Sequence, residues 1–409
     1  MQTHLSEQFQ DTPEGREAEA ILRKCVHCGF CTATCPTYQV LGDELDGPRG
    51  RIYLIKRVLE GEQPTRDTQL HLDRCLTCRN CESTCPSGVE YGHLVDIGRR
   101  IVDEKVPRGA GSRALRWLLK EGLTSPLFAP AMKMGQAVRP LLPRALQDKV
   151  PAAQPSGAWP TRQHPRKMLM LAGCVQPAMM PNINAATARV LDAAGIETVV
   201  AKAAGCCGAI RFHLNDHDGG RAQMRANIDA WWPFIERGEV EAIVMNASGC
   251  GVTVKEYGHM LSADAAYAEK ARRISALTVD LSELLPQLVT ALAGKVRAAP
   301  GVIAYHPPCT LQHGQKLRGG VEEGLGELGF TVRVAPAESH LCCGSAGTYS
   351  VLHPDIAHEL RDRKVGHLQE LAPQAIVSAN IGCITHLQSG TATPVRHWVE
   401  LLDEALQPS

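Results

Sequence analysis

Eight of the 16 cysteines lie in two short runs that share one spacing. The runs are CVHCGFCTATCP (25–36) and CLTCRNCESTCP (75–86), each C-x2-C-x2-C-x3-C-P. This spacing is typical of bacterial [4Fe–4S] sites, in which the fourth cysteine of one run ligates the cluster of the other. Three thiolates spaced in this way can wrap three corners of a cube, and the fourth reaches the neighbouring cube. We therefore predict one cluster on Cys25, Cys28, Cys31 and Cys85, and a second on Cys75, Cys78, Cys81 and Cys35.

A pair of zinc sites is the alternative for these two runs. Zinc commonly takes four ligands from two C-x2-C pairs and leaves no cysteine over. Two complete four-cysteine runs, closed by Pro36 and Pro86, fit that arrangement poorly. The spacing therefore favours two clusters.

The other eight cysteines form two sets of four, about 135 residues apart. Each set contains a single cysteine, then a CCG triplet, then another single cysteine. Gly208 and Gly344 close the triplets, and glycine there permits a tight turn and a close backbone approach to a bound group. Such a regular repeat indicates duplication of one structural unit. The sets are Cys174, Cys206, Cys207 and Cys250, and Cys309, Cys342, Cys343 and Cys383.

Short apolar runs precede these cysteines, and helix-like stretches separate the runs. Examples are KMLMLAGC (167–174), VEAIVMNASGC (240–250) and QAIVSANIGC (374–383). The alternation predicts α/β units with parallel strands and with each cysteine beyond the carboxyl end of a strand. Open α/β sheets bind ligands at that edge. We expect the duplication to bring the two sets toward each other around a pseudo-twofold axis.

Two interpretations of this second group of cysteines stay open. Lone cysteines at strand ends are often only small buried residues. Six strand-end positions with two adjacent cysteine pairs favour a metal, cluster or redox role, and a third cluster is one candidate. His213, His306, His340 and His386 lie near these motifs, but each is more typical of a surface or packing histidine.

The elements around the first two runs are expected to be helical. Thr12 can cap a helix that opens at Pro13 and ends just before Cys25. Between the runs, RIYLIKRVLEGE (51–62) has apolar residues at helical spacing and Gly61 near its end. The long separation of the two runs exceeds what a compact βαββαβ domain would use. A helical two-cluster domain is therefore predicted.

Composition limits the cellular setting and the class of partner. The 409 residues carry 43 basic and 43 acidic side chains, and aromatic residues make up only 4%. This balance gives no general attraction to nucleic acid, so we predict no nucleic-acid partner. The polar start (1–20) has no signal-peptide pattern, and no apolar stretch is long enough to span a membrane. We expect a cytoplasmic protein, in which clustered cysteines are metal ligands or redox groups.

Four segments are predicted. They are a helical two-cluster domain (1–104), a basic, proline-rich linker (105–166), a first α/β unit (167–295) and a second α/β unit (296–409). The fold class is thus an all-helical domain followed by a duplicated α/β cysteine-rich domain.

The linker has an unusual charge. Residues 105–150 contain nine basic residues against two acidic ones, Glu121 and Asp148. One interpretation is a surface for anionic lipid headgroups or an acidic partner. The other, which we favour slightly, is a solvated connector, because the prolines prevent one long amphipathic helix.

The two cysteine runs, the stretch GPRGRIYLIKRVLEG (47–61) and the duplicated CCG units occur in an order that resembles one family. This is the family of iron–sulfur subunits of bacterial glycolate oxidase (glycolate dehydrogenase). Its wider relatives are the small subunit of anaerobic glycerol-3-phosphate dehydrogenase, lactate-utilisation proteins and heterodisulfide reductase subunits. The resemblance covers most of the chain.

The resemblance implies an electron-transfer subunit with two [4Fe–4S] clusters that works beside FAD-binding glycolate oxidase subunits. The flavoprotein would oxidise glycolate to glyoxylate, and this chain would pass electrons toward quinone or another membrane acceptor. It would then associate peripherally with the cytoplasmic side of the inner membrane. No catalytic acid or base is predicted in this chain, because the chemistry on the hydroxy acid belongs to the flavin.

The chain departs from the family pattern at the end of each CCG unit. The full unit usually closes with C-x2-C, but Thr253 and His386 stand where the last cysteine would be. Each unit lacks one thiol, which puts a non-cubane cluster of the heterodisulfide reductase type in doubt.

Three alternatives to this function follow from the sequence. The chain could serve a lactate or glycerol 3-phosphate dehydrogenase instead. The CCG half could itself reduce a disulfide or a quinone, at Cys207 and Cys343. A third alternative is a scaffold in which the metal sites serve only to fold the helical domain.

Overall fold

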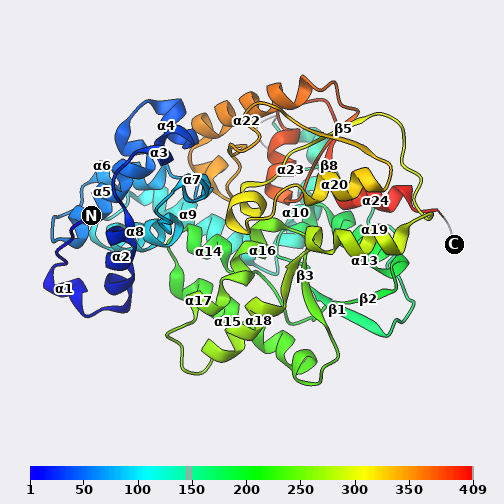
Figure 1. Cartoon of the computed structure of the whole chain (residues 1–409), viewed down its shortest axis with the longest axis horizontal. Coiled ribbons are helices and arrows are strands. Elements are labelled where there is room, and N and C mark those ends of the chain that lie inside the picture. The colour runs from blue at the N-terminus through cyan, green and yellow to red at the C-terminus, as the bar shows by residue number, and fades with distance from the viewer. Residues whose placement is uncertain (144–146, 148–149, 408–409) are drawn as a thin grey trace.

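The computed structural model describes residues 1–143, 147 and 150–407. Figure 1 shows a helical domain at the N-terminal end and an α/β body formed by the C-terminal part of the chain. The predicted fold class is confirmed: helices precede two parallel-sheet α/β units.

The helical domain contains no strand among its residues, all of which are described. Its first long helix has the predicted start: Thr12 Oγ1 accepts a hydrogen bond from the Gly15 amide at 3.0 Å, and Pro13 is the first helical residue. The helix expected over 51–62 runs from Pro48 to Leu59. The elements are α1 (Glu7–Gln10), α2 (Pro13–Lys24), α3 (Phe30–Ala33), α4 (Pro36–Leu41), η1 (Glu44–Asp46), α5 (Pro48–Leu59), α6 (Arg66–Asp73), α7 (Asn80–Thr84) and α8 (Tyr91–Lys105).

The core of this domain lies where α5 crosses α8. Ile55 and Leu94 are fully buried there, together with Ile21 and Leu22 of α2. A Cβ on Gly98 of α8 would lie 2.6 Å from Ile55, so glycine permits the close approach of the two helices. Helix α7 of the second cysteine run lies on the side that faces the α/β body, whereas Cys28 in the first run is exposed (Figure 1).

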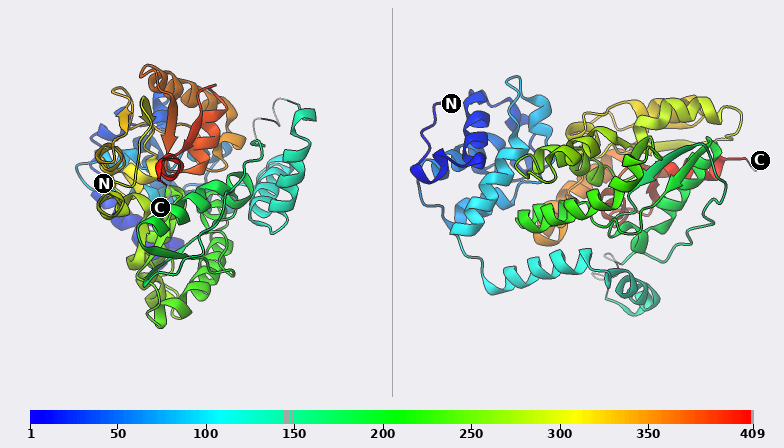
Figure 2. Two further views of the ribbon diagram at one scale, coloured as in Figure 1. Left: turned by 90° about the vertical axis from the view of Figure 1, so that its right-hand side faces the viewer. Right: turned by 90° about the horizontal axis from the view of Figure 1, so that it is seen from below.

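Two further helices, α9 (Ala110–Thr124) and α10 (Phe128–Ala137), occupy the basic linker, followed by η2 (Arg139–Leu141). As expected from the prolines, they are not one long helix: the break falls at Ser125 to Leu127. Figure 2 shows both helices at the periphery of the molecule. The linker charges Arg144, Asp148 and Lys149 lie outside the described residues.

The α/β body has two four-stranded sheets, and every strand pair in both is parallel. Their orders are β2-β1-β3-β4 and β6-β5-β7-β8, so the second sheet repeats the topology of the first. The last strand of each sheet is only three residues long, and the apolar runs did not predict it. The strands are β1 (Arg166–Met170), β2 (Ile196–Val199), β3 (Ala242–Met245), β4 (Thr278–Asp280), β5 (Val302–Tyr305), β6 (Thr331–Val334), β7 (Ala375–Ser378) and β8 (Val395–His397).

Helices cover both sheets, and we call β1 to α19 the first unit and β5 to α24 the second unit. In the first unit they are α12 (Gln176–Met179), α13 (Pro181–Ala193), α14 (Ala209–His213), α15 (His217–Glu236), α16 (Ser248–Lys255), α17 (Tyr257–Met260), α18 (Ala268–Leu277), η3 (Leu281–Leu284) and α19 (Leu285–Leu292). In the second unit they are η4 (Thr310–Gly314), α20 (Gly320–Glu327), α21 (Tyr349–Leu352), α22 (Pro354–Gln369), α23 (Ile381–Gln388) and α24 (Trp398–Ala405).

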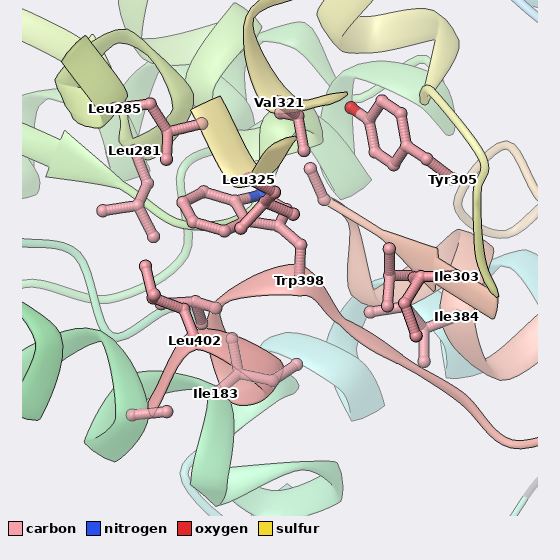
Figure 3. Close-up of a cluster of buried hydrophobic side chains, with 14 of the residues drawn as sticks. Ile183, Leu281, Leu285, Ile303, Tyr305, Val321, Leu325, Ile384, Trp398 and Leu402 are labelled. Atoms are coloured by element: carbon pink, nitrogen blue, oxygen red, sulfur yellow. The ribbon is translucent and has the colours of Figure 1, made fainter. Parts of the chain in front are cut away.

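The two units exchange their last helices. α19 of the first unit packs on α20 of the second, and α24 of the second packs on α13 of the first. Leu285 and Leu325 belong to one shared core with Ile183, Leu402 and the fully buried Trp398 (Figure 3). This common core fixes the two sheets relative to each other and brings both sets of cysteines to the same region.

Candidate redox sites

The loops of the two N-terminal cysteine runs turn through left-handed backbone. His27 and Gly29 have positive φ in the first run, and Thr77 and Arg79 have positive φ in the second. For a residue other than glycine this conformation costs about 1–2 kcal/mol. The loops therefore curl around a centre, at a cost that a bound group can offset.

Cysteines from both runs line the first cysteine cavity. Cys25, Cys28 and Cys31 come from the first run, Cys85 comes from the second, and Cys81 contributes at the edge. The remaining wall includes apolar side chains from the helical domain core: Ile52, Val89 and Tyr91.

The second cysteine cavity mirrors this exchange. Cys75, Cys78 and Cys81 belong to the second run, and Cys35 comes from the first. Tyr91, Cys81 and Pro48 line both cavities, so the two cavities are neighbours. The structure thus gathers the same sets of four that the spacing predicts for the two clusters.

Two thiols that line these cavities, those of Cys31 and Cys81, are poor acids by themselves. Burial, with Cys25 next to it, raises the pKa of Cys31 to about 11. Burial and the neighbouring Cys78 raise the pKa of Cys81 well above its ordinary value. Four thiolates that converge on one cavity repel one another unless a multivalent cation compensates their charge, which fits an iron–sulfur group.

A buried arginine faces the second cysteine cavity. Arg51 is 1% exposed, and its Nε donates to the His71 carbonyl at 2.7 Å while its Nη1 donates to Thr37 Oγ1 at 3.1 Å. Burial acts to lower the pKa of Arg51, but Cys75 and the other acidic groups around it outweigh that effect and hold the pKa above its ordinary value. A fixed positive charge beside thiolates stabilises an anionic cluster.

The other eight cysteines line one central cavity of about 830 Å³. They reach it from the carboxyl ends of β1, β2 and β3 in the first unit and β5, β6 and β7 in the second, as the repeat predicts. Cys78 of the second cysteine cavity also lines it. Both sets of four and one thiol of the helical domain therefore meet in a single space.

In the first unit, Cys206 is the centre of its set. Cys174 and Cys207 both hydrogen bond with Cys206, and these bonds lower its pKa to about 3. Cys207 also contacts Cys250. Gly208, with φ of 98°, closes the turn as expected, and its amide donates to Cys206 Sγ at 3.5 Å.

In the second unit the thiols form a continuous line. Hydrogen bonds join Cys383 to Cys343, Cys343 to Cys342, and Cys342 to Cys309. Cys309 contacts Cys78 as well, so the line ends at a thiol of the second cysteine cavity. The second unit is thereby connected directly to the helical domain, whereas the contacts of the first set stay within the first unit.

Polar contacts fix the helical domain against the second unit at this junction. Asn80 Nδ2 donates to the His340 carbonyl at 3.2 Å, and the Tyr349 hydroxyl donates to the Arg74 carbonyl at 3.0 Å. Ser83 Oγ lies 2.9 Å from His313 Nδ1. These bonds hold the loop that carries Cys78 at the edge of the central cavity.

The histidines near the motifs differ in their surroundings. His386 Nε2 donates to the Ala357 carbonyl at 3.0 Å, and Thr253 Oγ1 donates to the Gly249 carbonyl at 3.0 Å, so both side chains have partners in their own units. His306 is 1% exposed, and neither of its ring nitrogens has a hydrogen-bond partner. The sequence alone favours a surface or packing role for His306, and the structure buries it. Its position directly after β5 was the available signal.

Two family models match the chain at these sites. A "4Fe-4S dicluster domain" covers residues 21–89, and a "Cysteine-rich domain" covers residues 168–255 and again 303–388. The chain is thus an iron–sulfur protein in which a dicluster domain precedes a duplicated cysteine-rich domain.

Comparison with curated proteins places it more narrowly: the chain belongs to the family of glycolate oxidase iron–sulfur subunits. It is 56% identical to the glycolate oxidase iron-sulfur subunit of Escherichia coli (strain K12), over the whole of both chains. A probable glycolate oxidase iron-sulfur subunit of Bacillus subtilis (strain 168) is 28% identical over 94% of this chain and 92% of that protein. Lactate utilization protein A of Geobacillus thermodenitrificans (strain NG80-2) is 26% identical over 58% of this chain and 98% of its own length. The resemblance noted from the sequence is confirmed.

Proposed function

We propose that this chain is the electron-transfer subunit of a glycolate dehydrogenase complex. The observation that carries the proposal is the junction at Cys78, which lines both the second cysteine cavity and the central cavity. Full-length similarity to a glycolate oxidase subunit supports the substrate, and similarity to lactate utilization proteins keeps D-lactate as the alternative. Glycolate would be oxidised to glyoxylate on a partner subunit that holds FAD.

Within this proposal the two cysteine cavities hold one [4Fe–4S] cluster each. Such clusters supply one-electron transfer. The proposed ligands of the first are Cys25, Cys28, Cys31 and Cys85, and those of the second are Cys75, Cys78, Cys81 and Cys35. The left-handed loops orient the thiolates, Arg51 holds positive charge at the second set, and the apolar walls exclude water, which together tune the potentials.

The chain itself supplies a route rather than a catalytic group. Cys81 and Tyr91 line both cysteine cavities, so the two proposed clusters are neighbours, and the contact of Cys78 with Cys309 places the second cluster beside the central cavity. Electrons from the flavoprotein would leave through that cavity toward quinone or another membrane acceptor. We further propose peripheral association with the inner membrane. Among the described residues, no helix is long and apolar enough to cross one.

The proposed domain limits follow the same organisation: 1–104, the linker 105–166, and units at 167–295 and 296–409. Supporting them, α8 ends at Lys105, β1 begins at Arg166 and β5 begins at Val302.

Iron analysis of the native complex tests the proposal. An anaerobic preparation is expected to contain about eight irons per copy of this chain, as two cubanes require. Addition of glycolate to the complex should reduce both clusters, as followed by EPR. Stoichiometric zinc in place of iron would contradict the cluster assignment. Clusters that stay oxidised with glycolate, D-lactate and glycerol 3-phosphate would leave only the scaffold role.

A second candidate function rests on the thiols of the central cavity. The low pKa of Cys206, which hydrogen bonds from Cys174 and Cys207 produce, makes it a thiolate that could attack a disulfide. Replacing the attacking Cys206 and its neighbour Cys207 with serine should then abolish turnover while both cubane EPR signals remain. Unchanged turnover in that double variant would remove this candidate.

A further inference from the structure

The second unit contains a set of donors that the first unit lacks. A ligand nitrogen of His306 and the sulfurs of Cys343 and Cys383 all lie within 4.8 Å of one another, and all three residues are buried. The first unit has Leu171 in the equivalent place, directly after β1, and leucine has no donor atom. The two units therefore differ at a position that faces the cysteines.

Hydrogen bonds fix the backbone of His306, but its imidazole ring has no hydrogen-bond partner. Its backbone amide donates to the Val377 carbonyl at 2.8 Å, and its carbonyl accepts from Ser378 Oγ at 3.0 Å. Both ring nitrogens lack a partner although the residue is 1% exposed. A buried polar group that makes no hydrogen bond is costly and calls for an explanation such as a bound ion.

The spacing of the three donors suits one metal ion. Two thiolates on one tetrahedral zinc lie about 3.8 Å apart, because each Zn–S bond is about 2.3 Å. Ligands of a cubane bind different irons and stand further apart. The buried Lys364, whose Nζ donates to the Glu338 carbonyl, adds positive charge beside the thiols of Cys309, Cys342 and Cys343.

We propose that the second unit binds a single tetrahedral divalent ion, zinc or ferrous iron, through His306, Cys343 and Cys383. Cys342 lies outside this group of three, but its thiol contacts that of Cys343, which makes it the candidate for a fourth donor. The histidine would thus replace the thiol that the family pattern loses at His386. This site is separate from the two proposed clusters.

Metal analysis of the full chain with its clusters intact tests this inference. We expect one equivalent of zinc or iron beyond the irons of the two clusters. Cobalt(II), supplied to chain stripped of that ion, should give thiolate charge-transfer bands. His306→Leu, which introduces the residue found in the first unit, should lower the content of the extra ion at least tenfold and leave both cubane EPR signals unchanged. His306→Cys should retain the extra ion. Cys250→Ser in the first unit is the matched control and should keep the ion.

Two results would overturn the proposal. One is an unchanged equivalent of metal in His306→Leu, and the other is its loss in Cys250→Ser. Because the readout is metal content and not turnover, a failure here is distinguishable from a failure of the proposed function.

A separate observation concerns the outer face of α9 and α10. Neither helix contains a buried residue, and large apolar side chains are exposed along both. Trp117 and Leu118 on α9 are 62% and 59% exposed. Met134 on α10 is 67% exposed, and Leu127 and Leu141, which flank that helix, are 74% and 86% exposed.

The charge of this face is one-sided. From residue 105 to 143, Glu121 is the one acidic residue, and its carboxylate pairs with Arg211 at 2.6 Å. Arg113 and Lys133 are exposed among the apolar residues. An exposed apolar surface with tryptophan and unpaired cations is complementary to an anionic lipid surface, and Trp is favoured at that interface.

The inner face of the same helices has a different role. Leu119, Leu123, Phe128 and Met132 line the central cavity, so α9 and α10 separate that cavity from the surroundings. Figure 2 shows the two helices along the outside of the body. An apolar acceptor dissolved in a bilayer beneath them would be adjacent to the cavity.

We infer that the outer face of α9 and α10 is the surface by which this chain docks on an anionic bilayer. The inference rests on the proposed function in one respect: docking would present the central cavity to a quinone-class acceptor. Vesicle binding tests the docking by itself, independently of turnover.

The experiment uses the full chain with its clusters and vesicles of phosphatidylcholine with 30% phosphatidylglycerol. The chain should float with these vesicles and should bind pure phosphatidylcholine more weakly. Leu118→Glu, Leu127→Glu and Met134→Glu together should lower partitioning at least about a hundredfold, because three apolar side chains no longer enter the lipid. Arg113→Gln and Lys133→Gln should lower it about fivefold for each charge removed. Leu70→Glu, at an exposed leucine of the helical domain, is the matched control and should bind as the parent does.

Unchanged EPR signals show that each variant is folded. Absence of flotation for the parent chain would overturn the inference. Binding of the triple variant to vesicles as strongly as the parent would also overturn it. If the parent does not bind vesicles and the triple variant no longer assembles with the flavoprotein, this face is a protein interface instead.

Discussion

The helical domain and the α/β body each contribute eight cysteines, but they arrange them in opposite ways. In the helical domain, two local loops with left-handed residues curl around two small cavities. In the α/β body, six separate strand ends deliver the thiols to one large cavity. Local spacing therefore defines the first group, whereas tertiary topology defines the second.

A comparison within the α/β body refines this contrast. The two units share strand order, CCG turns and capped helices after the last strand, yet the residues at equivalent places differ. His306 stands against Leu171, and the N-cap after the last strand is His397 in one unit and Asp280 in the other. The two units thus share one fold but differ in the side chains beside the central cavity and at the helix caps.

The largest expected effect separates the two groups of cysteines. Cys85→Ser should remove the first cluster, although its other three ligands are in the first run, and iron should fall from about eight to about four per chain. Cys250→Ser in the central cavity should leave the cluster iron unchanged. Iron analysis with EPR of both variants checks this. Equal loss in the two variants, or full iron in Cys85→Ser, would contradict the assignment.

The next effect compares the two cysteine cavities of the helical domain. Arg51→Met removes the buried cation beside Cys35 and Cys75 and leaves Asp46 without one of its partners, which is expected to cost about 3–5 kcal/mol of stability. It should also lower the midpoint potential of the second cluster, because a nearby positive charge favours the reduced form.

Arg49→Met is the matched control, because Arg49 lines the first cysteine cavity but its side chain is 39% exposed. It should cost less than about 1 kcal/mol. Thermal melting and redox titration followed by EPR measure both quantities. If the two variants shift the midpoint potentials of their clusters equally, the effect that we assign to the burial of Arg51 is wrong.

A smaller effect compares the CCG turns of the two units. Gly344 has φ of 88°, and an added Cβ would lie 2.4 Å from the Ala357 backbone oxygen. Gly344→Ala should therefore destabilise the chain by about 1–3 kcal/mol or more. Gly208→Ala meets the Gly220 carbonyl only at 3.0 Å and the flexible Met224 side chain, so a smaller loss is expected. Gly366→Ala, in open space on α22, should be neutral or stabilising, and a melting temperature for each variant tests this order.

The smallest effect is a difference in pH dependence between the two caps. Burial lowers the pKa of His397 to about 3, whereas the unfolded chain has the ordinary value near 6.5. The unfolded state therefore binds the proton more readily, and stability should fall by up to about 1.4 kcal/mol per pH unit as the pH drops below about 6.5. His397→Asn should remove that slope between pH 7 and 5.5.

The cap in the first unit should behave in the opposite sense. Burial raises the pKa of Asp280, so its carboxylate opposes folding as the pH rises above about 4. Asp280→Asn should leave the slope between pH 7 and 5.5 as in the parent. Melting temperatures of the parent and both variants at several pH values test these expectations. If stability depends on pH equally in the parent and in His397→Asn, the effect assigned to His397 is wrong.

Much of this architecture could be predicted because the signals are local. The cysteine spacing, the Thr12–Pro13 helix start and the apolar runs before the CCG cysteines each act over a few residues. The short strands β4 and β8 escaped prediction because three residues carry no periodicity.

The non-local features could not be read from the sequence. The contact between Cys78 and Cys309 depends on how the helical domain sits against the second unit. The importance of His306 appears only when its ring is seen without a partner beside Cys343 and Cys383. Both depend on residues that are distant along the chain, for which a single sequence gives no periodic signal.

The exchanged helices have a consequence for biogenesis. Because α24 docks on α13, the core shared by the two α/β units is complete only after α24 has been synthesised. The helical domain has its own core and can enclose its cysteines much earlier on the ribosome. Maturation would then follow a fixed order: the helical domain would receive its clusters first, and the thiols of the α/β body would be enclosed last.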